Sequence, residues 1–320
     1  MTAKRPRICV IVNPVSGVQR TALDDITTYL EAQQTHDFEI CVTKRGGDAC
    51  RFAQAAAARQ VDVVAAYGGD GTMMEVAEGL RESDLPMAIL PGGTGNVMAI
   101  ELGIPTDLSA ALDLAFDPAH QVRVVDIGCI DNQYFLLRSG LGYEAEMSAS
   151  VDRSEKSKSG RWAYVRNAIR KLRNLRPVQY VITIDGEVHV QRGITCMICN
   201  STSIGIPNLR LVSASDVSDG LLDVLVIHNV RPATIINLMI DILRGILPGA
   251  KDGETQNTHW QGKEVTVELS RRQLVARDGE PIKRAKRVSA HVVPQALKVI
   301  VPAITLETTI EHLDRDQTAV

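Results

Sequence analysis

Aromatic residues and long apolar runs are both scarce in this chain of 320 residues. Tryptophan, tyrosine and phenylalanine together make up 4% of it, and 35 basic against 38 acidic side chains leave a net charge of −3. Nucleic-acid binding relies on a basic face and on aromatic stacking, so this composition argues against it. The most apolar helical window, residues 233–248, is interrupted by Asp241 and Arg244 and is too short to span a bilayer.

Cysteine is sparse as well. The six cysteines are scattered, mostly within apolar runs, which suits buried reduced thiols better than a disulfide framework. Cys196 and Cys199 have the spacing of a metal-binding pair, but their strand-like surroundings place them on opposite faces. The N-terminal residues show no signal-peptide pattern. We therefore expect a cytoplasmic protein without a cysteine metal site.

The first third of the chain alternates strand-like and helical segments. We expect strands at 7–13, 38–43, 61–67 and 86–90, helices at 20–34, 49–60 and 72–82, and polar loops at 13–17, 43–48, 68–72 and 91–96. This alternation predicts a doubly wound α/β domain with a parallel sheet. Ligands of such sheets bind at the carboxyl ends of the strands, where these loops lie.

The most informative loop is Gly68-Gly69-Asp70-Gly71-Thr72, which follows an apolar run. Glycine lets a phosphate approach the main chain without meeting a Cβ atom. The helix expected after the loop would direct its N-terminus at that phosphate, and Thr72 can cap this helix or bond a phosphate oxygen. The loop therefore predicts a nucleotide phosphate site.

Short strands with hairpin signals dominate the rest of the chain. We expect them at 122–130, 133–139, 178–184, 187–199, 221–228, 264–269, 273–277 and 288–300, with helices at 158–174 and 232–246. This pattern predicts an antiparallel β-rich second domain. We divide the chain into a nucleotide-binding domain, 1–124, to which the tail 301–320 could return, and a substrate domain, 125–300, with an active-site cleft between the two.

Several ordered motifs carry a family resemblance. They are Asn13-Pro14-x-Ser16-Gly17, Gly68-Gly69-Asp70-Gly71-Thr72-x-x-Glu75-Val76, Pro91-x-Gly93-Thr94-Gly95-Asn96, Asp126-Ile127-Gly128, Asp219-Gly220-Leu221-Leu222-Asp223 and Asp278-Gly279-Glu280. With them the chain resembles the diacylglycerol kinase catalytic family, soluble bacterial lipid kinases related to sphingosine kinases and more distantly to NAD kinases. The resemblance implies an NAD-kinase-like first domain and transfer of the γ-phosphoryl group of ATP, with Mg²⁺, to a lipid hydroxyl in phospholipid metabolism.

The resemblance also implies the nucleotide site. The residues that would hold ATP are Asn13, Pro14, Val15, Ser16, Gly17, Thr43, Gly68, Gly69, Asp70, Gly71, Thr72, Met73, Met74 and Thr94. The chain has no P-loop lysine, so main-chain amides, hydroxyls and Mg²⁺ would balance the triphosphate charge. Asp70 either contacts Mg²⁺, directly or through water, or bonds amides of its own turn.

Two residues depart from the family pattern. Met74 stands where asparagine is usual, and Val97 stands where aspartate often follows Asn96. Met74 removes a side-chain donor and acceptor. We interpret this as a change in nucleotide fit rather than a loss of activity, because the phosphate-facing glycines are intact.

The tripeptide Asp-Gly-Glu occurs three times, at 185–187, 252–254 and 278–280. Only the last copy matches the family's catalytic position, and the first reads as a plain hairpin turn. A kinase needs a carboxylate within hydrogen-bond reach of the acceptor hydroxyl. The sequence thus favours Asp278 and Glu280 as catalytic residues and leaves open which of them is the base.

A metal site is also implied by the resemblance. Asp216, Asp219 and the carbonyl of Leu221 match the positions at which the family holds a structural Mg²⁺, and carboxylates and carbonyls are the oxygen ligands that this ion prefers. From the residues alone, a solvated Asp-Gly turn is the alternative interpretation.

Basic residues suggest how a lipid could be reached. Nine of them lie between Arg153 and Arg176, with one acid. This segment is either a peripheral contact with anionic membrane at the inner membrane surface or an ordinary amphipathic helix. The exposed run Lys283–Arg287 could meet phosphate or a lipid headgroup.

The most economical hypothesis is a lipid kinase for a diacylglycerol-like or long-chain-base acceptor. Two alternatives remain: an NAD kinase-like enzyme, and a catalytically silent nucleotide- or lipid-binding regulator. The sequence does not identify the acceptor lipid or the oligomeric state.

Overall fold

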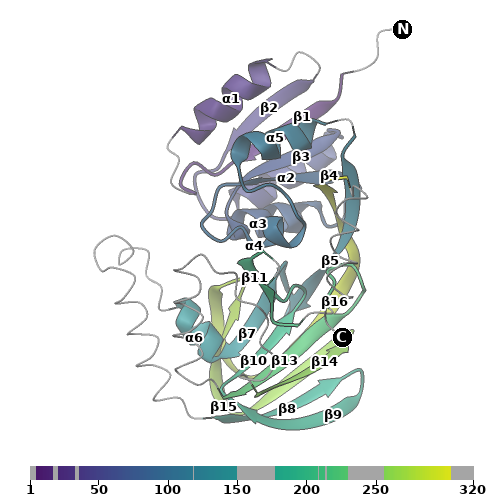
Figure 1. Ribbon diagram of the computed structural model, residues 1–320. Coiled ribbons are helices and arrows are strands. Elements are labelled where there is room, and N and C mark those ends of the chain that lie inside the picture. Colours follow the sequence, from purple (N-terminus) through teal and green to yellow (C-terminus); the bar gives the residue numbers. More distant parts are fainter. Residues whose placement is uncertain are drawn as a thin grey trace, which may run out of the picture. The chain divides into compact units, whose positions relative to one another are not determined.

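The structure is a computed structural model that describes residues 5–16, 21–32, 36–117, 119–149, 177–207, 209–212, 215–229 and 256–303 (Figure 1). By its contacts the chain divides into two compact units. The first comprises Met1–Val124 and Leu297–Val320, and the second Val125–Ala296. We refer to them as the α/β unit and the β-rich unit.

The α/β unit is built on a parallel sheet. Its strands are β1 (Arg7–Val12), β2 (Asp37–Val42), β3 (Val63–Gly68) and β4 (Pro86–Pro91). They lie in the order β2-β1-β3-β4, and the last residues of β16 (Glu280–Val301) add a parallel strand beside β4. The order places the loops that follow β1, β3 and β4 on neighbouring strands, which confirms the expected doubly wound sheet.

Helices cover this sheet. α1 (Ala22–Ala32) and α5 (Leu108–Phe116) share a buried cluster with Tyr67 and Leu90 of the sheet. α2 (Asp48–Ala58) and α3 (Asp70–Leu80) pack against each other, and α4 (Val97–Glu101) follows β4. The sequence reading did not predict α4 or α5. α5 begins with Asp107, whose carboxylate accepts a hydrogen bond from the Ala110 N–H at 3.1 Å and caps the helix.

The β-rich unit is antiparallel, as expected. Its elements are β5 (Gln121–Ile130), β6 (Gln133–Phe135), β7 (Arg138–Gly142), α6 (Tyr143–Ala149), β8 (Val178–Ile184), β9 (Glu187–Gly193), β10 (Thr195–Cys199), β11 (Ser203–Ile206), β12 (Leu209–Arg210), β13 (Leu222–Asn229), β14 (Gln256–Gly262), β15 (Glu264–Arg277) and β16. The strands run in the order β14-β13-β10-β7-β15-β16, with β8 and β9 added beside β15. β11 and β12 form a separate hairpin.

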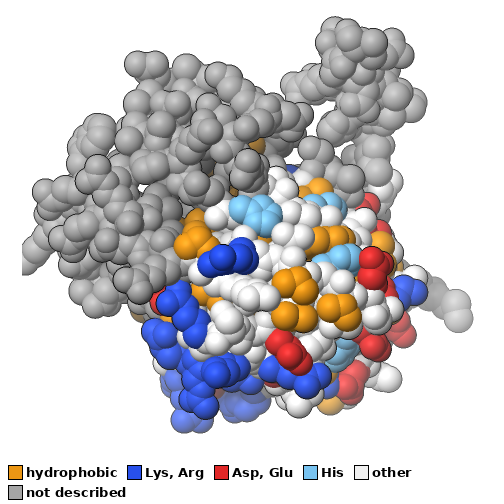
Figure 2. All heavy atoms as spheres, turned by 90° about the horizontal axis from the view of Figure 1, so that it is seen from below, with side chains coloured by type: hydrophobic (Ala, Val, Ile, Leu, Met, Phe, Trp, Pro, Cys, Tyr) orange, Lys and Arg blue, Asp and Glu red, His pale blue; other side chains and the backbone are white. Residues whose placement is uncertain are grey.

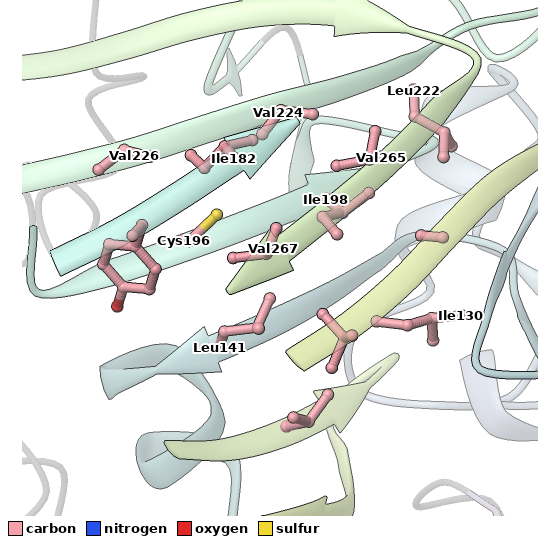
Figure 3. Packing of buried hydrophobic residues seen from close by; sticks show 14 of the residues in the cluster. Ile130, Leu141, Ile182, Cys196, Ile198, Leu222, Val224, Val226, Val265 and Val267 are labelled. Atoms are coloured by element: carbon pink, nitrogen blue, oxygen red, sulfur yellow. The ribbon is translucent and has the colours of Figure 1, made fainter. Parts of the chain in front are cut away.

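Aliphatic side chains from these strands form the core of the β-rich unit. Ile182, Ile198, Val224 and Val267 are all fully buried and converge in it (Figure 3). Cys196 belongs to this core, whereas Cys199 joins a smaller cluster with Met197 and Leu225. The two cysteines therefore lie on opposite faces, as the alternation predicted, and all six cysteines are free thiols.

Several expectations for the second half need correction. The expected strand 133–139 is two strands, β6 and β7, and the expected strand 288–300 is part of the longer β16. The expected strand 187–199 is two strands, β9 and β10, and the expected strands 264–269 and 273–277 are the single strand β15. The elements α6, β11, β12 and β14 were not predicted. The expected helices 158–174 and 232–246 lie outside the described residues. None of the helices described is long and apolar enough to cross a membrane.

The break between β9 and β10 has a local cause. Gly193 approaches β13 so closely that a Cβ atom there would lie 2.7 Å from the Ile227 carbonyl oxygen. The next residue, Ile194, donates its N–H to that same oxygen at 2.8 Å. A continuous strand with side chains throughout could not pass at this distance.

Candidate functional site

The loops after β1 and β3 meet through Asn13. Its Nδ2 donates to the Thr72 hydroxyl at 2.9 Å, and its Oδ1 accepts from the Val15 N–H at 3.2 Å. The Asn13 N–H donates to the Tyr67 carbonyl at 3.0 Å. Pro14 and Val15 are exposed at this edge. Two of the loops predicted to bind nucleotide are thus joined by a side chain that the sequence singled out.

The loops after β3 and β4 meet through glycines. A Cβ atom on Gly93 would lie 2.6 Å from the Cα atom of Gly69, and the Gly92 N–H donates to the Gly68 carbonyl at 2.8 Å. On Gly68 itself a Cβ atom would lie 2.5 Å from the Thr72 hydroxyl oxygen. Contacts this short exclude every larger residue unless the neighbouring atoms shift.

The helix after β3 starts earlier than expected. α3 begins at Asp70, with Gly69 as N-cap, so Asp70, Gly71 and Thr72 form its first turn instead of the preceding loop. The N–H groups of Thr72 and Met73 donate to the Gly69 carbonyl at 2.9 and 3.1 Å. The first N–H groups of a helix have no partner within it and favour an anion. The exposed main chain at Gly71 offers such a position.

The carboxylate of Asp70 contacts the neighbouring loop. It accepts from the Met98 N–H in α4 at 3.3 Å, and a Cβ atom on Gly95 would lie 3.0 Å from its Oδ2. The sequence offered two roles for Asp70, a contact with Mg²⁺ or bonds to amides of its own turn, and did not anticipate this bond to the start of α4. Asp70 therefore links the Gly68–Thr72 loop to the start of α4.

Other predicted nucleotide residues differ in accessibility. Thr94 is exposed, and Ser16 is partly buried. Thr43 donates its N–H to the Val12 carbonyl at 2.9 Å and is 9% exposed. Met73 and Met74 are 2% and 3% exposed, so both are buried in the interior of the α/β unit. Gly17 lies outside the described residues.

Two residues stabilise these loops in ways that the sequence reading missed. Asn96, at φ 48°, accepts from the Gly93 N–H and donates to the Gly93 carbonyl, both at 2.9 Å, and so closes the loop after β4. Glu75 of α3 accepts from the Ala49 N–H in α2 at 3.2 Å. Both belong to quoted motifs, but only the geometry reveals what each side chain bonds.

The β-rich unit carries the second candidate site, at the turn Asp278-Gly279-Glu280. The turn joins β15 to β16, with Arg277 paired to Glu280 and with φ 45° at Asp278 and 84° at Gly279. The Asp278 carboxylate accepts from the N–H groups of Leu136, Leu137 and Arg138, each at 2.9 Å. Three main-chain donors therefore occupy it.

Burial raises the pKa of the Asp278 carboxyl, while the bonds from Arg138, Leu136 and Leu137 act in the opposite direction. Glu280, two residues further on, is exposed. The turn thus contains one carboxylate committed to the main chain and one that solvent and a ligand can reach.

A third carboxyl group nearby was not anticipated from sequence. Burial raises the pKa of Glu144 in α6, and the Asp278 carboxylate adds to the rise. Its Oε2 atom is buried without a hydrogen-bond partner among the described residues. That atom lies 1.4 Å from where a Cβ atom of Gly140 would be. Gly140 is the only sequence signal for this carboxyl group.

The loop before β13 holds the predicted metal ligands. The carboxylates of Asp216 and Asp219 are exposed and accept from the N–H groups of Ser218 and Leu221 at 2.9 Å. Burial raises the pKa of Asp219, and the nearby carboxylates of Asp223, Asp216 and Asp126 raise it further. A cation would relieve this concentration of negative charge, so the donor set fits Mg²⁺.

Asp126 and Asp223 stabilise the surroundings of that loop. Asp126, 1% exposed, accepts from the N–H groups of Gly220 and Gln295 at 2.7 Å. Asp223 bonds the His259 Nε2 at 2.6 Å. Both aspartates lie in motifs quoted from the sequence, where no role could be read for them.

A different group of possible metal ligands lies in the α/β unit. Cys9, Glu39 and Cys41 are, in the described part of the chain, the one set of three acid, thiol or imidazole groups whose ligand atoms lie within 4.8 Å of one another. Glu39 there forms an ion pair with Arg59, and burial raises the pKa of Cys9. Both features oppose metal binding.

Comparison with known proteins places the whole arrangement in one family. The pattern of the diacylglycerol kinase catalytic domain matches residues 7–130, and that of the YegS C-terminal NAD kinase beta sandwich-like domain matches residues 139–301. The chain belongs to the diacylglycerol kinase catalytic family.

Individual relatives extend along most of the chain. A diacylglycerol kinase of Bacillus subtilis (strain 168) is 30% identical over 282 residues, which cover 87% of this chain and 90% of that protein. One of Staphylococcus haemolyticus is 29% identical over 74% of this chain and 72% of its own. The crystal structure of a candidate diacylglycerol kinase from Bacillus anthracis str. Sterne superposes with a TM-score of 0.72 at 29% identity, covering 92% of this chain and 97% of that one.

Proposed function

We propose that the protein is a lipid kinase that transfers the γ-phosphoryl group of ATP to the hydroxyl of a diacylglycerol-like or long-chain-base lipid. The observation that carries the proposal is the meeting of three loops at the carboxyl ends of β1, β3 and β4, in a chain of the diacylglycerol kinase family. The α/β unit would bind the nucleotide, and the β-rich unit would bind the lipid.

The α/β unit would hold ATP without a P-loop lysine. The candidate donors are the first N–H groups of α3 around Gly71, the hydroxyls of Thr94 and Ser16, and the main chain after β1. The close contact of Gly69 with Gly93 leaves no side chain in the way of a phosphate. These groups are neutral, so the family's Mg²⁺ would supply the positive charge that the triphosphate needs.

In the β-rich unit, Glu280 is the group that we assign as general base. It would accept the proton of the lipid hydroxyl as that oxygen attacks the γ-phosphorus and the bond to the β-phosphate oxygen breaks. Asp278 would position the turn, because its carboxylate accepts three main-chain N–H groups and has little capacity left for a substrate proton. This division separates two residues that the sequence treated as a pair.

Asp216, Asp219 and the Leu221 carbonyl would hold a structural Mg²⁺. When bound, the ion would neutralise two carboxylates and fix the loop that leads into β13. The protein would work in the cytoplasm at the inner membrane surface. Residues 153–176, for which the sequence suggested a membrane contact, lie outside the described residues.

A direct assay tests the proposal. Purified protein with Mg²⁺ and ATP is offered dioctanoylglycerol, sphingosine or NAD, and the products are identified by mass spectrometry. We expect a phosphorylated lipid that excess EDTA abolishes, and no phosphorylated NAD. Because one matched domain is named for its likeness to NAD kinase, formation of NADP alone would replace the proposal by an NAD kinase. ATP binding without any product would mean a binding protein.

A further inference from the structure

The β15–β16 hairpin carries an exposed basic cluster that the proposed chemistry does not use. Its register breaks between the pairs Glu268–Arg287 and Gln273–Ala285, so four residues of β15 lie opposite one residue of β16. A bulge disrupts the ladder locally and changes the direction of neighbouring side chains. We call the resulting cluster the basic bulge; all its side chains are exposed, and its members are Arg272, Arg284, Lys286 and Arg287.

Acidic partners neutralise little of the basic bulge. Arg287 pairs with Glu268 at 3.6 Å. For Arg272, Arg284 and Lys286 no ion pair is formed with any acid of the described residues. The whole chain has a net charge of −3, so this concentration of positive charge is local. It gives one part of the surface the opposite sign from the molecule as a whole.

The same sheet face exposes aliphatic side chains. Val188 and Val190 of β9 are 60% and 56% exposed. Val190 pairs with Val181 of β8, Val181 with Glu268 of β15, and Glu268 with Arg287 of β16. Because paired residues point to the same side of a sheet, the two valines share the outer face with Arg287. Three strand spacings, about 14 Å in total, separate the valines on β9 from Arg287 on β16.

Figure 2 views the β-rich unit from the end at which β8, β9 and β15 lie in Figure 1. Lys and Arg side chains gather on one side of this face, hydrophobic and histidine side chains occupy its middle, and acidic side chains lie mostly on the other side. The basic part is open to view. The face therefore combines a cationic region with exposed apolar atoms beside it.

We propose that this face, the basic bulge together with Val188 and Val190, docks on an anionic phospholipid surface. A bilayer surface presents phosphates to the cations and an apolar boundary to the valines within one plane, which matches a sheet face carrying both. The inference rests on the proposed function, because a lipid kinase must meet an acceptor that resides in a membrane. The docking surface is separate from the turn that holds Glu280.

Vesicle sedimentation tests the docking without any catalysis. The vesicles are phosphatidylcholine alone or phosphatidylcholine with phosphatidylglycerol at 7:3, and contain neither acceptor lipid nor nucleotide. We expect binding to the anionic vesicles only, reversed by high salt. Each cation near such a surface contributes roughly fivefold to the partition coefficient. The triple variant R272Q/R284Q/K286Q should therefore lose on the order of 100-fold.

A control with the same charge change lies in the α/β unit. Arg5, Arg51 and Arg59 are exposed there, and R5Q/R51Q/R59Q should bind anionic vesicles within about twofold of the wild type, because its charges lie outside the proposed face. V188T/V190T keeps the branched shape and removes apolar contact. It should weaken binding a few-fold, by a factor that salt does not change.

Several results would overturn the docking proposal. One is no binding of the wild type to anionic vesicles, and another is equal loss in the basic-bulge and control triples. Binding of polyglutamate by the wild type, together with absence of vesicle binding, would assign the face to an acidic protein instead. Phosphorylation of water-dispersed dioctanoylglycerol by R272Q/R284Q/K286Q should stay within about twofold of the wild type. That assay tests the proposed function separately from docking.

Discussion

Two turns of this molecule share the tripeptide Asp-Gly-Glu and almost the same backbone. Asp185 and Gly186 have φ of 48° and 91° between β8 and β9, and Asp278 and Gly279 have φ of 45° and 84° between β15 and β16. In both turns the aspartate carboxylate accepts main-chain N–H groups of a neighbouring segment. The Asp185 carboxylate accepts from the N–H groups of Lys263 and Glu264. The Asp278 carboxylate accepts from those of residues 136–138.

The two turns differ in their surroundings. Hydrogen bonds from the main chain of Glu264 and Lys263 hold the pKa of Asp185 below its ordinary value of 3.8, whereas burial raises the pKa of Asp278. Glu144, another carboxyl group with a raised pKa, adjoins only the second turn. The same tripeptide is thus a surface hairpin in one place and part of an acidic, partly buried site in the other. Local sequence determines the turn, and distant segments determine its environment.

The largest expected difference between the turns concerns their glutamates. Glu280→Gln should lower kcat on dioctanoylglycerol by about 10²–10⁴-fold, because it removes the proposed general base. Glu187→Gln makes the same chemical change in the matching position of the other turn and should leave kcat within about twofold. Steady-state kinetics of the two variants compare them directly. Equal kinetics in the two variants would remove Glu280 from the mechanism.

The next difference concerns stability. Asp278→Asn places an amide NH₂ against one of three main-chain N–H groups and should lower the free energy of unfolding by about 1–3 kcal/mol. Asp185→Asn should lower it by less than half as much, because water can reach its donors. Both tryptophans, Trp162 and Trp260, fall in the β-rich unit, so urea unfolding followed by tryptophan fluorescence reports on this unit. A larger loss in Asp185→Asn would contradict the assigned environments.

The smallest difference is one of pH dependence. A lowered pKa gives Asp185 a stabilising contribution above pH 3.8 that is lost as the pH falls through the folded-state pKa. A raised pKa gives Asp278 a contribution that is complete below pH 3.8 and is lost as the pH rises through its folded-state value.

Unfolding midpoints of the two asparagine variants between pH 3 and 6 test these signs. As the pH falls below 3.8, the gap between wild type and Asp185→Asn should narrow. The gap between wild type and Asp278→Asn should widen as the pH falls toward 3.8 from above. Parallel curves for the two variants would show that the turns do not differ in electrostatic environment.

Much of the fold was predictable because local patterns determine it. Alternating strands and helices predicted the parallel sheet of the α/β unit, and alternation within the strand 195–199 placed Cys196 and Cys199 on opposite faces. The limits of helix α3 were not predictable, because its start at Asp70 depends on Gly69 as N-cap and on contact with the Gly93 loop. The bulge in β15 likewise depends on pairing with a distant strand.

The candidate sites likewise combine features that local sequence predicts with features that depend on distant contacts. Glycine and hydroxyl patterns located the loops after β1, β3 and β4, and the family resemblance located the turn at 278–280. Neither could separate the roles of Asp278 and Glu280, since that requires knowing that residues 136–138 donate to Asp278. Gly140 was the one sequence signal for Glu144, whose unpartnered oxygen becomes visible only in the packed structure.

One measurement tests the central claim most directly. Total lipid extract is incubated with Mg²⁺, γ-labelled ATP and either wild-type protein or Glu280→Gln, and the products are separated by mass spectrometry, with ATP binding measured on both proteins by calorimetry. The account predicts labelled phospholipid from the wild type, little or none from Glu280→Gln, and equal ATP affinity. Equal labelling by the two proteins, or no labelled lipid from either, would contradict it.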